Sequence, residues 1–132
     1  MSGERDLDVL VRSMDPVVRP GAYAVATVDG YAALAGVVPD ATVNEEEGLT
    51  VVVPLAVAES LGLDVVFTAA WITLRVHSAL EAVGLTAAFS AALAQAGISC
   101  NVLAGRFHDH LLVPAGRRDD ALAALRALAR GE

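Results

Sequence analysis

The sequence contains no lysine, and all nine of its basic residues are arginine. Without lysine the chain cannot form a Schiff base, attach pyridoxal phosphate through its own side chain or build a P-loop. The single cysteine excludes an internal disulfide and fits a reducing cytoplasm. No apolar run reaches the roughly 20 residues of a membrane span. The first ten residues carry four charges, so they do not form a secretory signal. We therefore expect a cytoplasmic protein that does not enter a membrane.

Positive charge is also scarce. The net charge is −7, and Arg117-Arg118 is the one basic pair in the sequence, which argues against binding to nucleic-acid phosphates. The charges are unevenly distributed: residues 1–66 hold three arginines against eleven acidic residues, whereas residues 67–132 hold six against five. This imbalance indicates two units, which we place at residues 1–66 and 67–132.

What the chain has in quantity is apolar residues. They make up 55% of the 132 residues, and the mean hydropathy is +0.56. A chain of this composition buries a core and does not remain disordered. Its length is enough for one compact domain or for two small halves that share a core.

The stretch from Trp71 to Ala104 has the clearest pattern. Residues 71–78 alternate between apolar and polar, as in a half-buried strand. Residues 85–96 have the apolar spacing of an amphipathic helix, and Gly97 is placed to end it. Residues 98–104 alternate again. We therefore predict a strand, a loop, a helix and a strand, with a core formed by Leu74, Val76, Phe89, Leu93, Ile98, Val102, Val113, Leu122 and Leu125.

The patterns elsewhere are weaker. They predict strands at 7–12, 22–28, 49–53 and 110–113, and a short strand or extended segment at 31–39. They also predict an acidic loop at 40–48, a short helix at 55–61 and a helix at 117–130. The apolar stretch 65–76 is longer than a typical strand and is expected to serve both halves. No strand follows the last helix, so we expect residues 7–12 to fill the vacant edge of the second sheet.

The runs His77-Ser78, Val83-Gly84-Leu85 and Ala96-Gly97-Ile98-Ser99-Cys100-Asn101 resemble the ACT domain, a small ligand-binding regulatory module of amino-acid metabolic enzymes. The whole chain is similar to small bacterial stand-alone proteins with two ACT-like halves. The resemblance implies an α+β, ferredoxin-like fold: a βαββαβ antiparallel sheet with helices on one face, in tandem. It also implies a homodimer that regulates through a small-molecule ligand without catalysis.

The loop before the predicted helix is the candidate ligand site. Backbone N–H groups at a helix start attract a carboxylate, Glu81 can face an ammonium, and Asn101 can donate and accept hydrogen bonds. The resemblance places ligand contacts at Ser78, Val83, Gly84, Leu85 and Asn101. A purely structural role without a ligand is the alternative: Ser78 and Glu81 would form a local capping box, and Asn101 would hydrogen-bond at a sheet edge.

Two other groups of residues are considered as a metal site and a reactive thiol. His108 and His110 flank Asp109 and would point the same way in an extended segment, but a zinc ion needs a third ligand, and the spacing fits no standard zinc pattern. We interpret these residues as a polar cluster in a hairpin. Cys100 lies on the apolar face of its strand and is interpreted as a core thiol.

These observations lead to one main prediction and two alternatives. The main prediction is a non-catalytic regulatory protein that binds an amino acid and needs no cofactor or metal. The first alternative is a structural or protein-interaction module without a ligand. The second is a small hydrolase or isomerase that uses His108, Asp109 and His110.

Overall fold

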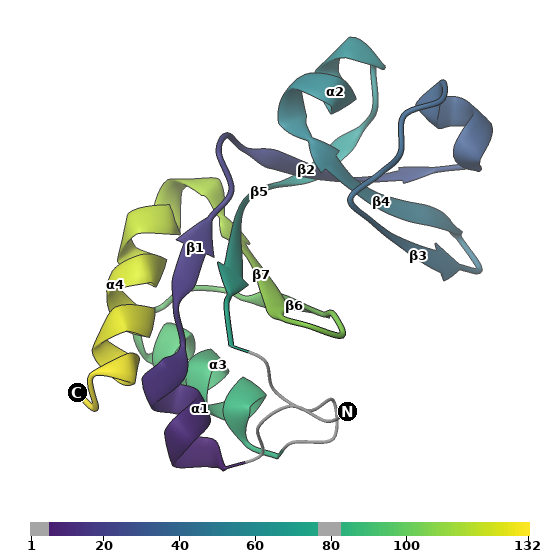
Figure 1. Cartoon of the computed structure of the whole chain (residues 1–132). Helices are drawn as coiled ribbons and strands as arrows, with labels where there is room; N and C mark the ends of the chain where they lie inside the picture. The colour runs from purple at the N-terminus through teal and green to yellow at the C-terminus, as the bar shows by residue number, and fades with distance from the viewer. Residues whose placement is uncertain (1–5, 77–82) are drawn as a thin grey trace. The chain divides into compact units, whose positions relative to one another are not determined.

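The chain forms two compact units in the computed structural model, which describes residues 6–76 and 83–132. Residues 20–69 form one of them, which we call the continuous unit. The segment up to Arg19 joins residues from Ala70 onward in the other, which we call the composite unit. Figure 1 shows the elements of both. The division of the sequence at residues 66 and 67 stays a prediction about the two halves; the packing of the chain groups the N-terminal segment with the second half.

The continuous unit is a small antiparallel sheet with little helix. It contains β2 (Tyr23–Val28), the 3-10 helix η1 (Tyr31–Leu34), β3 (Ala41–Glu45), β4 (Gly48–Pro54), α2 (Leu55–Ser60) and the first residues of β5 (Val65–Leu74). The strand order is β3-β4-β2-β5. Its apolar side chains form two clusters, one around Leu34, Leu49 and Val51 and the other around Ala24, Val53 and Ala58.

Two predictions in this unit are wrong. Residues 40–48 were expected to form an acidic loop, but they contain β3, whose register runs from Ala41 opposite Val52 to Glu45 opposite Gly48. The β-branched residues of β3 outweigh its acidic end, where Thr50 donates a hydrogen bond to the Glu45 carboxylate. Residues 31–39 begin with η1 and contain no strand, and Ala35 ends that helix with φ 51°. The strands predicted at 22–28 and 49–53 and the helix at 55–61 are confirmed.

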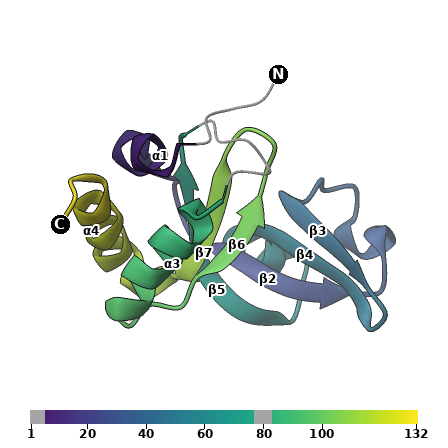
Figure 2. The same cartoon turned by 90° about the horizontal axis from the view of Figure 1, so that it is seen from below.

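The composite unit is built from both ends of the chain. It contains α1 (Leu7–Ser13), β1 (Pro16–Val18), the last residues of β5, α3 (Leu85–Gln95), β6 (Asn101–Ala104), β7 (Asp109–Pro114), the 3-10 helix η2 (Ala115–Arg117) and α4 (Arg118–Ala129). The strand order is β1-β5-β7-β6. The helices α1, α3 and α4 contact one another, and Figure 2 shows them gathered together.

The prediction of a strand at 7–12 is wrong, because these residues form α1. Asp6 caps the helix by accepting a hydrogen bond from the Val9 N–H at 3.2 Å. Leu10 is fully buried, and Met14 joins it in the core. A helical spacing of apolar residues thus outweighs the weak alternation in this segment.

The vacant sheet edge is nevertheless filled from the N-terminus, by β1. Pro16 lies opposite Leu74 and Val18 opposite Ile72, in antiparallel register. If β5, β6, β7 and β1 are numbered one to four, their order across the sheet is four, one, three, two. The continuous unit has the same order when it is counted β2, β3, β4, β5. Both units are therefore ferredoxin-like, and the composite unit takes its fourth strand from the start of the chain.

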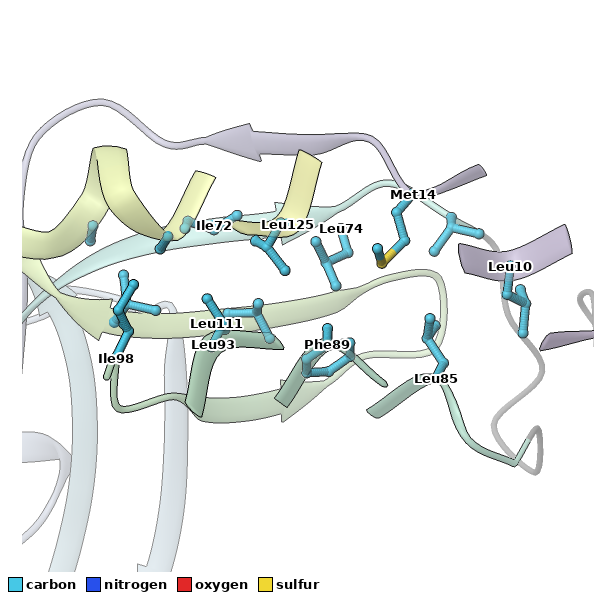
Figure 3. Close-up of a cluster of buried hydrophobic side chains, with 14 residues drawn as sticks. Leu10, Met14, Ile72, Leu74, Leu85, Phe89, Leu93, Ile98, Leu111 and Leu125 are labelled. Atoms are coloured by element: carbon cyan, nitrogen blue, oxygen red, sulfur yellow. The ribbon is translucent and has the colours of Figure 1, made fainter. Parts of the chain in front are cut away.

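The core of the composite unit lies between its helices and its sheet. Figure 3 shows side chains from α1, β5, α3, β7 and α4 converging there, among them Leu10, Ile72, Phe89, Leu111 and Leu125. Seven of the nine predicted core residues are buried, and Val102 and Leu122 are partly buried against them. Gly97 ends α3 with φ 73°, as predicted. Arg117 donates to the Ala96 and Gly97 carbonyls at 3.1 and 3.3 Å, so it satisfies the end of α3.

Candidate functional site

The predicted ligand site lies at the start of α3. Gly84 is the N-cap of this helix with φ 102°, a conformation that favours glycine, and among the described residues no side chain caps the helix. Leu85 is buried in the core, whereas Val83 is 83% exposed. Ser78 and Glu81 lie outside the described residues. The described part of the site is therefore an uncapped helix start with an apolar rim.

Helix α1 lies against this helix start. A Cβ atom placed on Gly84 would be 3.0 Å from Cδ2 of Leu7, so only glycine fits there without movement of Leu7. Leu7 is itself 38% exposed. The N-terminal helix, which the sequence did not predict, thus contributes a side chain to the surroundings of the candidate site.

Asn101 lies at the other end of α3. It is exposed at the start of β6, opposite Leu112 of β7, and β6 is the last strand in its sheet order. Eleven helical residues lie between Gly84 and the turn at Gly97, which separates the two ends of α3 by about 16 Å. The whole of α3 thus lies between Gly84 and Asn101 along the chain.

A polar cluster lies on the other face of the composite unit's sheet. Ile72 and Leu74 point into the helix-side core, so Trp71 and Thr73 lie on the opposite face of β5. The Thr73 hydroxyl is 2.9 Å from Nδ1 of His110, and the Trp71 indole nitrogen is 3.2 Å from that hydroxyl and 3.3 Å from Nδ1. The Arg19 guanidinium lies 3.8 Å above the Trp71 ring, within range of a cation–π interaction.

The two histidines of the turn behave differently. His110 is held by Trp71 and Thr73, and burial, Arg19 and His108 lower its pKa. His108 stands edge-on to His110, with 6.5 Å between ring centroids, and its buried Nδ1 has no hydrogen-bond partner in the part of the chain that the structure describes. Burial raises the pKa of the Asp109 carboxyl between them. Residues 6–76 and 83–132 contain no group of three side chains that could hold a metal ion.

Sequence reasoning found His110 but missed its partners. The alternation of β5 was enough to place Trp71 and Thr73 on one face, but no pattern indicates that β7 lies beside β5. Cys100 packs against the core, and burial raises the pKa of its thiol, which confirms its interpretation as a core residue.

A shallow groove runs between α3 and α4. Its volume is about 450 Å³, and most of its lining is alanine: Ala88, Ala91, Ala92, Gln95, Ala96, Ala124, Ala127, Leu128 and Glu132. Helix α3 carries no charged residue along its length. The groove is a recess between closely packed helices, with little polar lining to orient a ligand.

No helix in the described parts of the chain has both the length and the apolar character needed to cross a membrane.

Several solved structures are similar to this chain. A protein of unknown function from Vibrio cholerae, described as a possible transport protein, is 44% identical over 95% of this chain and 97% of its own, with a TM-score of 0.85. The ligand-free regulatory subunit of aspartate kinase from Thermus thermophilus is 14% identical over 86% of this chain and 95% of its own, with a TM-score of 0.69.

A third similar structure is Escherichia coli aspartokinase III in complex with aspartate and ADP, at 11% identity and a TM-score of 0.64. The match covers 86% of this chain but 32% of that enzyme. No curated protein matches the sequence. Two family models described as ACT domains match residues 2–70 and residues 66–127. The matches cover both halves of the sequence, and the chain belongs to the ACT domain family.

Proposed function

We propose that this chain is a non-catalytic regulatory protein that binds a free amino acid at the start of α3. Membership of the ACT family and the fold shared with regulatory subunits of aspartate kinase support a regulatory role. The observation that carries the location is the start of α3 at Gly84, where the N-cap residue is a glycine at positive φ and has no side chain of its own to cap the helix. Backbone N–H groups at such a helix start can donate hydrogen bonds to the ligand's carboxylate.

The ligand is proposed to be an amino acid because the start of α3 offers donors for a carboxylate and an apolar rim formed by Leu7 and Val83. Glu81, which lies outside the described residues, is proposed to face the ammonium. The aspartate in the complex of the Escherichia coli kinase belongs to that enzyme, and the identity of the ligand here is left to a screen.

A homodimer completes the proposal. Asn101 lies on the last strand of its sheet, and α3 separates it from Gly84 along the chain, so we propose that a second copy supplies Asn101 to a ligand at Gly84. The ligand would then lie between two chains, with the carboxylate on the helix of one and the Asn101 amide of the other beside it.

The proposal is tested by thermal unfolding of the purified chain with each of the twenty amino acids. An amino acid that binds the native state raises the unfolding temperature, and a concentration of 100 times Kd stabilises by about 2.7 kcal/mol. One amino acid or a chemically related group should show this effect, and Gly84→Val should remove it. If all twenty leave the unfolding temperature unchanged, the amino-acid proposal fails.

A structural module without a ligand is the second candidate, and the uncharged α3 with its alanine-lined groove is the observation that favours it. A protein of this kind would show no stabilisation in the screen. It would instead lose an assembly when Ala91, an exposed residue of α3, is replaced by arginine. Sedimentation of the Ala91→Arg variant beside the wild type separates the two candidates.

A further inference from the structure

His110 joins the two central strands of the composite unit. Its ring belongs to β7, and its Nδ1 atom meets Thr73 at 2.9 Å and Trp71 at 3.3 Å on β5. The contact lies on the sheet face opposite the helix-side core. It therefore ties β5 to β7 through side chains, in addition to the neighbouring position of the two strands in the sheet.

The hydrogen bonds around His110 indicate which of its ring nitrogens carries a proton. An indole N–H can only donate, whereas a threonine hydroxyl both donates and accepts. Trp71 lies within donor distance of both the Thr73 hydroxyl and Nδ1 of His110. The Thr73 hydroxyl is then free to donate to Nδ1. The contact of Trp71 with Nδ1 is a hydrogen bond only when that nitrogen carries no hydrogen, so this geometry favours the neutral ring with its proton on Nε2.

Protonation of His110 would place a second donor where the cluster needs an acceptor. The new Nδ1–H would lie 3.3 Å from the Trp71 indole nitrogen, so two donors would face each other and the hydrogen bond from Trp71 to Nδ1 would be lost. The neighbouring charges act in the same direction. Arg19, which follows β1, lies over the Trp71 ring, and His108 stands edge-on to His110 from the turn before β7. Asp109, the adjacent residue, is half-buried, and burial favours its uncharged form.

We propose that His110 is a proton-sensitive latch between β5 and β7, which is closed when the imidazole is neutral and opens when it is protonated. The latch makes the stability of the composite unit fall as the pH drops below the ordinary pKa of histidine, about 6.5. It is independent of the amino-acid site, since it uses neither the start of α3 nor Asn101. Either proposal can fail without the other.

The sign of the pH dependence follows from the direction of the shift. The fold lowers the pKa of His110 below the ordinary value for histidine, about 6.5. Between the two values the unfolded chain binds the proton and the folded chain does not, so stability falls as the pH falls. The contribution of His110 is complete above the unfolded pKa and is lost as the pH drops through the folded pKa. Each unit of lowering changes the unfolding equilibrium tenfold.

Nuclear magnetic resonance of the imidazole nitrogens in the full chain tests the latch. The expected spectrum shows neutral His110 with its proton on Nε2 and a titration midpoint below that of a free histidine. Thr73→Val removes the donor to Nδ1 and should raise the midpoint, whereas Thr73→Ser keeps the hydroxyl and should restore it. A proton on Nδ1 of the neutral ring, or equal midpoints in the wild type and Thr73→Val, would overturn the proposal.

Chemical unfolding between pH 5 and pH 8 provides a second test that does not depend on assignment of the spectrum. His110→Gln should be less stable than the wild type at pH 8, and this difference should narrow as the pH falls. His108→Gln keeps the contacts of His110 with Trp71 and Thr73 but removes one of the three causes of the lowered pKa. Its stability should therefore depend on pH less steeply than that of the wild type and more steeply than that of His110→Gln. Parallel stability curves for the wild type and His110→Gln would contradict the latch.

Discussion

The composite and continuous units share one strand order but differ in how they are stabilised. The composite unit packs three helices around a core of fourteen buried residues that includes Phe89 and several leucines. The continuous unit has α2, the short η1 and two small clusters rich in alanine and valine. The amount of apolar surface that leaves water sets the favourable free energy, so the composite unit is expected to be the more stable.

The comparison also shows that the order of strands in a sheet does not depend on their order in the chain. The fourth strand of the continuous unit follows α2 directly, whereas the composite unit takes its fourth strand, β1, from the N-terminus. An exposed sheet edge favours any strand that can pair with it. The segment before β1 then becomes α1, which has no counterpart among the elements of the continuous unit.

Replacement of a large core residue in each unit is expected to have the largest effect and to show which unit is more stable. Phe89→Ala empties a fully buried position in the composite unit and is expected to lower the free energy of unfolding by about 3–5 kcal/mol. Leu34→Ala in the continuous unit should cost about 2–3 kcal/mol, since the smaller cluster around it loses fewer contacts. Denaturant unfolding of both variants checks the order. A larger loss for Leu34→Ala would reverse the comparison.

The N-terminal helix provides the next largest effect. Leu10→Ala should destabilise the composite unit by about 2–4 kcal/mol, because Leu10 is fully buried among residues of the second half. Val11→Ala, at a partly buried neighbouring position, is the milder control. If Leu10→Ala leaves the midpoint of unfolding unchanged, α1 is not part of the composite core.

Substitution of the glycines at the two ends of α3 distinguishes loss of ligand binding from the cost of backbone strain. Gly84→Ala and Gly97→Ala both place a side chain at positive φ, at a cost of about 1–2 kcal/mol each. A Cβ on Gly84 would also press on Leu7, whereas open space surrounds Gly97. Gly84→Ala is therefore expected to weaken amino-acid binding as well, and Gly97→Ala is not. Calorimetry with the ligand from the screen measures both, and equal loss of affinity in the two variants would place the site elsewhere.

The smallest expected effect is that of Asn101→Ala. The side chain is exposed, so the free energy of unfolding should change by less than about 0.5 kcal/mol. Loss of one hydrogen bond to a ligand should weaken binding by about 0.5–1.5 kcal/mol. Gln95→Ala, an exposed amide of α3, is the control and should leave affinity unchanged. Full affinity in Asn101→Ala would remove Asn101 from the site.

The sequence predicted the second half of the chain well because its signals are local and strong. The apolar spacing of α3, the stop at Gly97 and the long β5 all follow from neighbouring residues, and the structure confirms them. The errors lie where a local pattern is weak: at residues 7–12, which became a helix, and at residues 40–48, which became β3. Residues 7–12 form a helix that packs against distant residues of the composite core, whereas residues 41–45 pair with β4, which follows them directly in the chain.

The polar cluster around His110 also depends on contacts that local sequence patterns do not predict. His110 stood out as a residue, but its contacts with Trp71 and Thr73 depend on the neighbouring position of β5 and β7. Residues 37 and 39 positions apart in the chain meet there. The glycine at position 84 was recognised because its requirement for positive φ is local. The presence of Leu7 beside it was not, because it depends on α1.

The most direct test of the proposed function is backbone NMR of the full chain during titration with each of the twenty amino acids. At least one should shift the amide resonances of Gly84 and Leu85 and of Asn101 in a saturable way. Residues of the continuous unit, such as those of β3 and β4, should move little. If no amino acid shifts these resonances at millimolar concentration, or if the saturable shifts are confined to residues 20–69, the account of the ligand site is wrong.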